Sequence, residues 1–225
     1  LAMTDDVGLN FAISSQTAKR FVDKYDPNSR QSNQSINQKV VVNSQKPKSS
    51  PPPSKPKNVY TGDPEAAKEY LDRLNVLFNV KGKEQEVINL ANIALSLDKN
   101  SAEAYNHRGN AKKGLNDHIG AISDYTNAIN INSKAASYYY NRAYSKDELE
   151  DYTGAISDYT RAIKINPNKE NYYFNRAYSK QNLEDYTGAI SDYTRAIKIK
   201  PKATTYFNRA LTKYELADYI GAISD

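Results

Sequence analysis

The residues with the most chemical potential are arginines and aspartates that recur at a fixed spacing. Each of four arginines is followed 16 residues later by an aspartate: Arg108 by Asp124, Arg142 by Asp158, Arg176 by Asp192 and Arg209 by Asp225. A guanidinium and a carboxylate can form a bidentate, charge-assisted pair. We expect each pair to join two neighbouring helices as a partly buried ion pair. The alternative is two independent solvated charges, which contribute only about 0 to 1 kcal/mol.

Residues suited to catalysis or metal binding are sparse in the rest of the chain. Cysteine is absent, which excludes disulfides, thiol nucleophiles and cysteine metal sites. His107 and His118 are the only histidines, and no cluster of carboxylates lies near them in the sequence. We interpret both as surface residues and expect no metal site. Glycines occur singly and do not form a phosphate-binding loop, so we predict no cofactor and no catalysis in this chain.

The elements that must position the arginines and aspartates are internal repeats. Residues 150–165 read EDYTGAISDYTRAIKI, and residues 184–199 read the same. Weaker copies cover residues 117–131 and 217–225, so that Ala121, Ala155, Ala189 and Ala222 stand 34, 34 and 33 residues apart. A period near 34 residues predicts stacked pairs of helices.

Each repeat carries two amphipathic helices, which we call A and B. Helix A is expected in stretches such as YYYNRAYSKDEL from Tyr138, where apolar residues stand three and four apart. Helix B contains the repeated GAI sequence. Small residues recur where the two backbones must approach: Gly109, Ala143, Ala177 and Ala210 on helix A, and Ala128, Ala162 and Ala196 on helix B. Pro167 and Pro201 follow helix B, where proline ends a helix.

These features together resemble the tetratricopeptide repeat family. The matching marks are the aromatic residues Tyr105, Tyr139, Tyr173 and Tyr206, the small residue four positions later, the alanine of GAI, the aromatic residues Tyr125, Tyr159 and Tyr193, and the two prolines. The arginines stand where the family usually has leucine. The resemblance implies an all-α fold, a right-handed superhelix of antiparallel helix pairs whose A helices line a concave groove for partner peptides.

Carried over position by position, the resemblance places twelve residues of the A helices in this groove. They are Asn106, Asn110 and Lys113, then Tyr140, Tyr144 and Asp147, then Phe174, Tyr178 and Gln181, then Phe207, Leu211 and Tyr214. Aromatic side chains are enriched where proteins bind one another, so we predict a peptide- or protein-binding groove. The alternative is that the aromatic residues pack against the next repeat and leave no groove.

The predicted groove does not suit a free carboxylate terminus. Related repeats that clamp such a terminus use lysine and arginine together with asparagine, but here Asn106, Asn171 and Asn175 stand where cations would be needed. The ligand would lose about 1 to 3 kcal/mol per charged hydrogen bond. We therefore expect no terminal-carboxylate clamp. A segment with aliphatic or proline side chains, with a basic residue near Asp147 and Glu148, suits the groove better.

The net charge of +5 is confined to one segment. Residues 26–60 hold six Lys and Arg against one Asp, whereas residues 61–225 hold 22 of each sign. Because phosphate binding needs a concentrated basic surface, the neutral repeats argue against a nucleic-acid partner. No apolar run approaches the ~20 residues that cross a bilayer, so we expect no membrane insertion.

Residues 1–25 differ from the repeats. Leu9, Phe11 and Ile13 alternate with small or polar residues, which predicts a strand, and a helix is expected after Ser14 or Ser15. The segment resembles the last strand and closing helix of trypsin-like serine proteases of the high-temperature-requirement type, with a serine in place of the usual proline. That resemblance implies a protease parent whose catalytic residues precede Leu1 and whose repeats recruit substrates. This is the alternative to a plain interaction module.

The remaining segments complete the predicted organisation. Residues 26–62, rich in Pro, Ser, Asn and Lys, are expected to be a disordered linker. Residues 63–101 read as a degenerate first repeat that begins at Asp63-Pro64 and turns at Gly82. Full repeats are expected at residues 102–135, 136–169 and 170–202, and a truncated one at 203–225. We read the chain as part of a longer protein.

Overall fold

The structure, a computed structural model, describes residues 63–78 and 80–216. The regular elements in this part are all helices, in the order α2 (Pro64–Leu77), α3 (Glu84–Leu97), α4 (Ala102–Gly114), α5 (His118–Ile131), α6 (Ala136–Glu148), α7 (Tyr152–Ile165), α8 (Glu170–Asn182), α9 (Tyr186–Ile199) and α10 (Ala203–Glu215). The predicted strand, the protease-like segment, the linker and the last helix after residue 216 lie outside the described residues. None of the described helices is long and apolar enough to cross a membrane.

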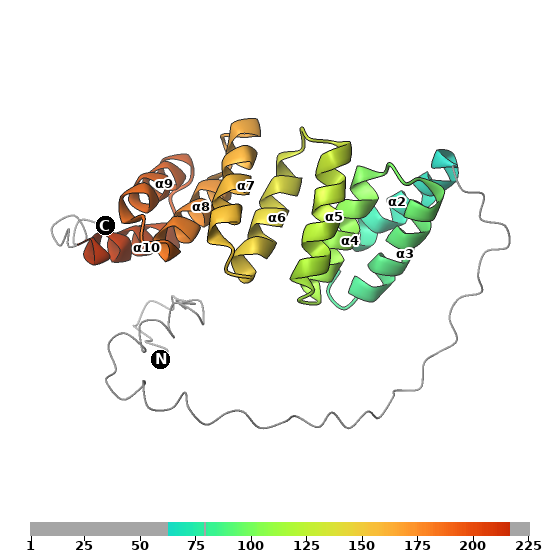
Figure 1. Cartoon of the computed structure of the whole chain (residues 1–225), viewed down its shortest axis with the longest axis horizontal. Helices are drawn as coiled ribbons and strands as arrows, with labels where there is room; N and C mark the ends of the chain where they lie inside the picture. The colour runs from blue at the N-terminus through green and yellow to red at the C-terminus, as the bar shows by residue number, and fades with distance from the viewer. Residues whose placement is uncertain (1–62, 79, 217–225) are drawn as a thin grey trace, which may run out of the picture. The chain divides into compact units, whose positions relative to one another are not determined.

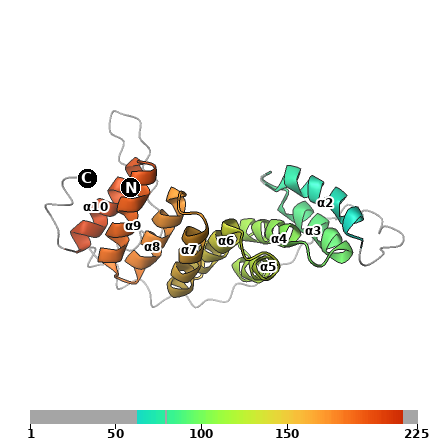
Figure 2. The same ribbon diagram turned by 90° about the horizontal axis from the view of Figure 1, so that it is seen from above.

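The helices form antiparallel pairs that stack in chain order. Figure 1 shows them side by side from α2 and α3 at the right to α10 at the left, and Figure 2 shows the same row from above. The A helices are α4, α6, α8 and α10, and the B helices are α5, α7 and α9. Each A helix packs on the preceding B helix, and α4, α6 and α8 also pack on the B helix of their own repeat. The predicted all-α solenoid of helix pairs is confirmed for the described part of the chain.

Local sequence explains where the pairs turn. Glu150 has φ 62°, which reverses the chain after α6, and the side chain of Asp151 then accepts a 2.9 Å hydrogen bond from the N–H of Gly154. This is a helix N-cap, which satisfies a backbone donor that the helix itself leaves unpaired. The turns before α5 and α9 have the same N-cap, formed by Asp117 and Asp185. The identical turns give consecutive pairs the same geometry, as a solenoid requires.

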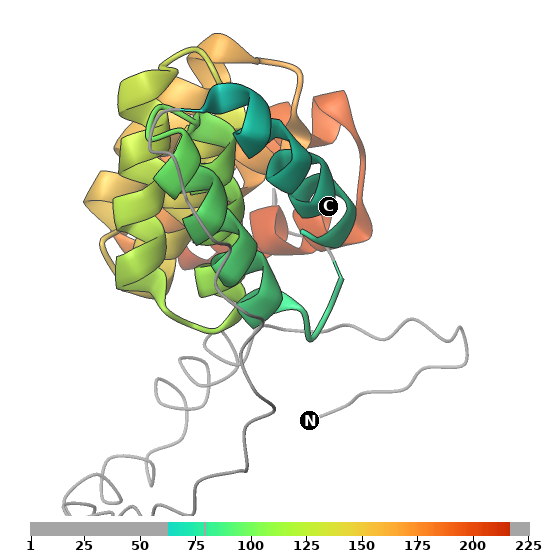
Figure 3. The same ribbon diagram turned by 90° about the vertical axis from the view of Figure 1, so that its right-hand side faces the viewer.

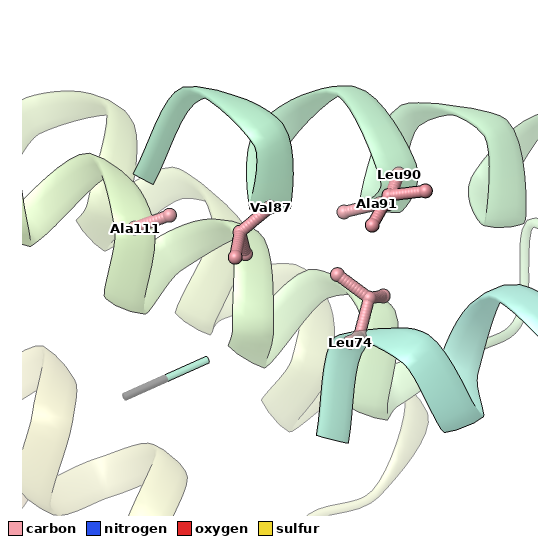
Figure 4. Close-up of a cluster of buried hydrophobic side chains, with 5 residues drawn as sticks. All are labelled: Leu74, Val87, Leu90, Ala91 and Ala111. Atoms are coloured by element: carbon pink, nitrogen blue, oxygen red, sulfur yellow. The ribbon is translucent and has the colours of Figure 1, made fainter. Parts of the chain in front are cut away.

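The degenerate first pair stacks on the first full repeat through its own apolar cluster. Asp63 caps α2 as predicted, with proline next, and Gly82 turns the chain at φ 84°. Figure 4 shows the buried cluster that joins three helices: Leu74 of α2, Val87, Leu90 and Ala91 of α3, and Ala111 of α4. Figure 3 views the described helices from the end where α2 and α3 lie. Within the described residues, the stacked row therefore runs from α2 to α10.

Small residues let the A and B helices approach around a buried tyrosine. Ala143 of α6 and Ala155 of α7 pack with Tyr159, and all three are fully buried. Ala177, Ala189 and Tyr193 repeat this arrangement one pair later. Burial of a large ring between alanines stabilises each pair at small entropic cost.

Candidate peptide-binding groove

An ion-pair ladder fixes each A helix to its B helix. Arg142 donates to Asp158 through Nε and Nη2 at 2.8 and 2.7 Å, and only 7% of the Asp158 side chain is exposed. Arg108 with Asp124 and Arg176 with Asp192 repeat this geometry. The predicted pairing of helices A and B is confirmed for these three repeats, and solvated independent charges are excluded there. Asp225 lies outside the described residues.

Two further contacts of the ladder could not be predicted from the arginine spacing. A lysine one turn after each arginine adds a second cation to the same carboxylate, as Lys146 does to Asp158 at 2.8 Å. Arg142 also donates through Nη1 to Thr126 of the preceding B helix at 3.0 Å, and Arg176 and Arg209 do the same to Thr160 and Thr194. α6 and α8 are therefore each held by two B helices.

The hydroxyl groups of buried tyrosines on the B helices form hydrogen bonds with side chains of the A helices. Tyr159 donates its hydroxyl to Asp147 at 2.8 Å, and Tyr193 donates to Gln181 at 3.2 Å. Burial, and then the charge of Asp147, raise the pKa of Tyr159, so its hydroxyl stays protonated and donates. The tyrosines are core residues, as predicted. Their hydroxyls also orient two of the predicted groove residues.

The first full repeat departs from this pattern because Lys113 occupies the position of Asp147. A lysine cannot accept a hydrogen bond, and Tyr125 donates instead to Asn110 at 2.8 Å. Gly109 leaves room for that ring, since a Cβ there would lie 2.7 Å from a Tyr125 ring carbon. The glycine on α4 therefore leaves space for the different position of the tyrosine ring in the repeat that has a lysine in place of the aspartate.

We call the twelve predicted groove residues the inner row, and the structure places all of them on α4, α6, α8 and α10. None is fully buried. The most accessible rings are those of Tyr144, Phe207 and Tyr214, at 37%, 45% and 50%. The half-buried members are Asn106, Asn110, Lys113, Tyr140, Asp147, Phe174, Tyr178, Gln181 and Leu211.

Two aromatic members of the inner row also take part in packing the helices against one another. Tyr140 stacks on Tyr172 with ring centroids 5.0 Å apart, and its hydroxyl accepts a 3.0 Å hydrogen bond from Asn175. Phe174 meets Tyr193 edge to face at 5.5 Å. The alternative considered from the sequence, packing against the next repeat, therefore describes part of the surface of Tyr140, whereas Phe174 packs on the B helix of its own repeat. The ring of Tyr144 contacts no other aromatic ring among the described residues, and the ammonium of a lysine lies over it.

Asp147 is a half-buried carboxylate held by neutral donors. It accepts from the hydroxyls of Tyr159 at 2.8 Å and Ser179 at 2.7 Å. Burial raises its pKa to about 6, the two hydrogen bonds oppose that rise, and the charges of Glu148 and Asp151 add to it. A carboxylate in this setting gains most from a cation brought by a ligand.

Lys113 is half-buried, and the contact that its ammonium makes within the described part of the chain is with an aromatic ring. Its Nζ lies 5.2 Å from the centre of the Tyr144 ring, and burial lowers its pKa. Burial and then the neighbouring Glu148 raise the pKa of Tyr144 to about 12, so the ring stays neutral. Ser145, one residue further, is fully buried, and its hydroxyl has no partner among the described residues.

The amides at the positions of the carboxylate clamp bind each other and the tyrosines. Asn141 donates to Asn106 at 3.1 Å, and Asn175 donates to Tyr140. These contacts place neutral, hydrogen-bonded amides where a carboxylate clamp needs cations.

His107 corrects the interpretation of the histidines as surface residues. It is only 4% exposed, its Nε2 lies 3.0 Å from Asn75 Oδ1, and its ring meets Phe78 at 5.2 Å. Burial lowers its pKa. His118 is half-buried. Within the described residues, no group of histidines and carboxylates could hold a metal ion.

The inner row begins beside a hollow that the sequence did not indicate. Its volume is about 210 Å³, and its lining mixes apolar and polar side chains: Leu77, Phe78, Val80, Lys81, Glu84, Val87, Asn110, Ala111 and Gly114. It lies between the end of α2, the start of α3 and α4. The sequence did not reveal this hollow, because the first helix pair is degenerate and has no exact copy with which it could be aligned.

Stacked antiparallel pairs with an accessible inner row define a helical-repeat protein, and the comparisons specify the repeat. Residues 136–169 match one model of the tetratricopeptide repeat, and residues 102–134 and 170–202 match another. These three stretches are tetratricopeptide repeats. No comparison supports the resemblance of residues 1–25 to a serine protease, and no curated protein matches the chain.

Solved structures with the same fold share little sequence with this chain. One is YrrB, described as a TPR protein with an unusual peptide-binding site: 20% identity, TM-score 0.63, covering 71% of this chain and 86% of that one. Another is MamA from Desulfovibrio magneticus RS-1: 16% identity, TM-score 0.66, covering 73% and 92%. A third is pilF of Pseudomonas aeruginosa: 16% identity, TM-score 0.63, covering 71% and 73%. At these identities the likeness establishes the fold alone.

Proposed function

We propose that this chain is a non-catalytic interaction module that holds an extended segment of a partner protein along the inner row. The observation that carries the proposal is the set of accessible rings on the A helices α6 and α10, Tyr144, Phe207 and Tyr214, together with the ion-pair ladder that fixes α6. Rigid aromatic side chains offer contact area at small entropic cost. YrrB, which shares the fold, is described by its peptide-binding site.

The ion-pair ladder is important for binding because it orders the site in advance, so less conformational entropy is lost when a ligand binds. α6 and α8 are each tied to two B helices, so their part of the inner row is arranged before a ligand arrives. Preorganisation of this kind raises affinity without new contacts. The buried tyrosines add to it by fixing Asp147 and Gln181.

The ligand we expect is an internal peptide segment with aliphatic or proline side chains. A terminal carboxylate would meet Asn106, Asn141 and Asn175, whose amides already bind each other or Tyr140. A nucleic acid is disfavoured because residues 61–225 carry equal numbers of positive and negative side chains.

The test is selection of random peptides on the full chain, followed by affinity measurement on variants. Tyr144→Ala with Tyr178→Ala should weaken the selected peptides at least about tenfold, because two central aromatic contacts are lost. Tyr186→Ala, at the start of the B helix α9, is the matched control and should leave affinity unchanged. Far-UV circular dichroism must show equal helicity in all three. Unchanged affinity in the double variant, or equal loss in the control, would reject the groove.

A further inference from the structure

Two opposite charges stand at equivalent positions of the inner row in consecutive repeats. Lys113 lies on α4, Asp147 lies on α6, and the next equivalent residue is the neutral Gln181 on α8. Both charged side chains are half-buried. Within residues 63–78 and 80–216, neither of the two makes an ion pair.

The lysines next to these positions are engaged elsewhere. Lys112 binds Asp124 at 2.8 Å, and Lys146 binds Asp158 at 2.8 Å, on the side of the A helices that faces the B helices. Among the described residues, Asp147 accepts hydrogen bonds only from the neutral hydroxyls of Tyr159 and Ser179. The carboxylate is therefore oriented but not neutralised by the described residues.

Lys113 lacks the partners that its position has in the next repeat. There, a buried serine of the following A helix donates to the inner-row residue, as Ser179 does to Asp147. The equivalent serine for Lys113 is Ser145, whose buried hydroxyl has no partner in the described part of the chain. The equivalent tyrosine, Tyr125, donates to Asn110. The buried hydroxyl of Ser145 without a partner in the described residues, and the Lys113 ammonium with only an aromatic ring as its contact there, together point to an acceptor that a ligand supplies.

The distance between the two charges sets the spacing of the ligand. α4 and α6 are in contact, and packed helices lie about 8 to 10 Å apart. A polyproline II segment rises about 3.1 Å per residue with three residues per turn, so its side chains three positions apart lie on one face and span this distance. The aromatic ring of Tyr144 lies within reach of Lys113, on the helix that carries Asp147.

We infer that the inner row selects segments in which an acidic and a basic side chain stand three residues apart, with the acid at Lys113 and the base at Asp147. This inference rests on the proposed function, since it names the chemistry of the segment that the groove would hold. Complementary charges add selectivity to aromatic contacts that are themselves tolerant of sequence. The order of the two residues follows from the direction in which the segment runs.

The experiment uses synthetic peptides of one composition on the full chain. One pair carries glutamate and arginine three positions apart, in either order, and a third peptide carries them adjacent. One of the two spaced orders should bind about tenfold more tightly than the adjacent arrangement at low salt, and the advantage should shrink as salt rises. Equal affinity of all three would overturn the charge pattern.

Variants separate this inference from the proposed function. Lys113→Gln and Asp147→Asn should each remove the spacing preference, while Lys134→Gln, at an exposed turn, should keep it. The double variant Lys113→Glu with Asp147→Lys should prefer the opposite order. If peptides bind and depend on Tyr144 and Tyr178, but Lys113→Gln and Asp147→Asn change nothing, the groove stands and the charge pattern is wrong. If none of the peptides or selected segments binds, both proposals fail.

Discussion

Removing one carboxylate of the ladder should destabilise the fold far more than removing an exposed one. Asp158 accepts three charge-assisted hydrogen bonds, two from Arg142 at 2.8 and 2.7 Å and one from Lys146 at 2.8 Å. Breaking a buried pair from one side costs about 3 to 5 kcal/mol because the partner charge stays behind. The side chains of Arg142 and Lys146 are 17% and 20% exposed, so water recovers part of this. We expect Asp158→Ala to cost about 3 kcal/mol.

The assay is denaturant unfolding of the full chain followed by far-UV circular dichroism. The matched control is Asp151→Ala, an exposed aspartate that only caps the same helix, α7, and should cost about 1 kcal/mol. Asp192→Ala should behave like Asp158→Ala, because Arg176 and Lys180 surround Asp192 identically. If Asp158→Ala were no more harmful than Asp151→Ala, the ladder would be a set of independent charges and the reasoning would fail.

Two other perturbations probe the inner row itself. The pKa of Asp147 is raised to about 6, so the folded state binds its proton more tightly than the unfolded one, and stability should fall as pH rises from about 4 to 6. Across this pH range the unfolding free energy of the parent should fall by up to roughly 2 kcal/mol more than that of Asp147→Asn. If the unfolding free energies of the two proteins changed in parallel with pH, the burial effect would be contradicted. Gly109→Ala should displace the Tyr125 ring and destabilise the chain by about 1 kcal/mol despite better helix propensity, whereas a rise in melting temperature would show that the ring yields freely.

The repeats made much of the fold predictable, because each structural requirement is written several times in the sequence. The same 16-residue spacing in four copies indicated a contact between helices A and B, and three copies of it form. The second cation at each aspartate was not predicted. Lys112, Lys146 and Lys180 look like ordinary surface lysines until the geometry of the helix pair is known.

The errors lie where the sequence is not repeated or where one position has two roles. His107 is buried because the degenerate first pair brings Asn75 and Phe78 against it, and no second copy reveals that contact. Tyr140 and Phe174 contact their own or the next repeat and still keep half-buried surface on the inner row. The types of side chain in a sequence do not show which part of a ring packs inside the protein and which part is left accessible for binding.

The most direct test of the peptide-binding groove is an NMR titration of the full chain with a peptide selected on it. Chemical-shift changes should concentrate on α4, α6 and α8 around Lys113, Tyr144, Asp147 and Tyr178, and should saturate together as for a single site. Changes confined instead to the exposed leucines of the turns, Leu115, Leu149 and Leu183, would contradict the assignment of binding to the inner row.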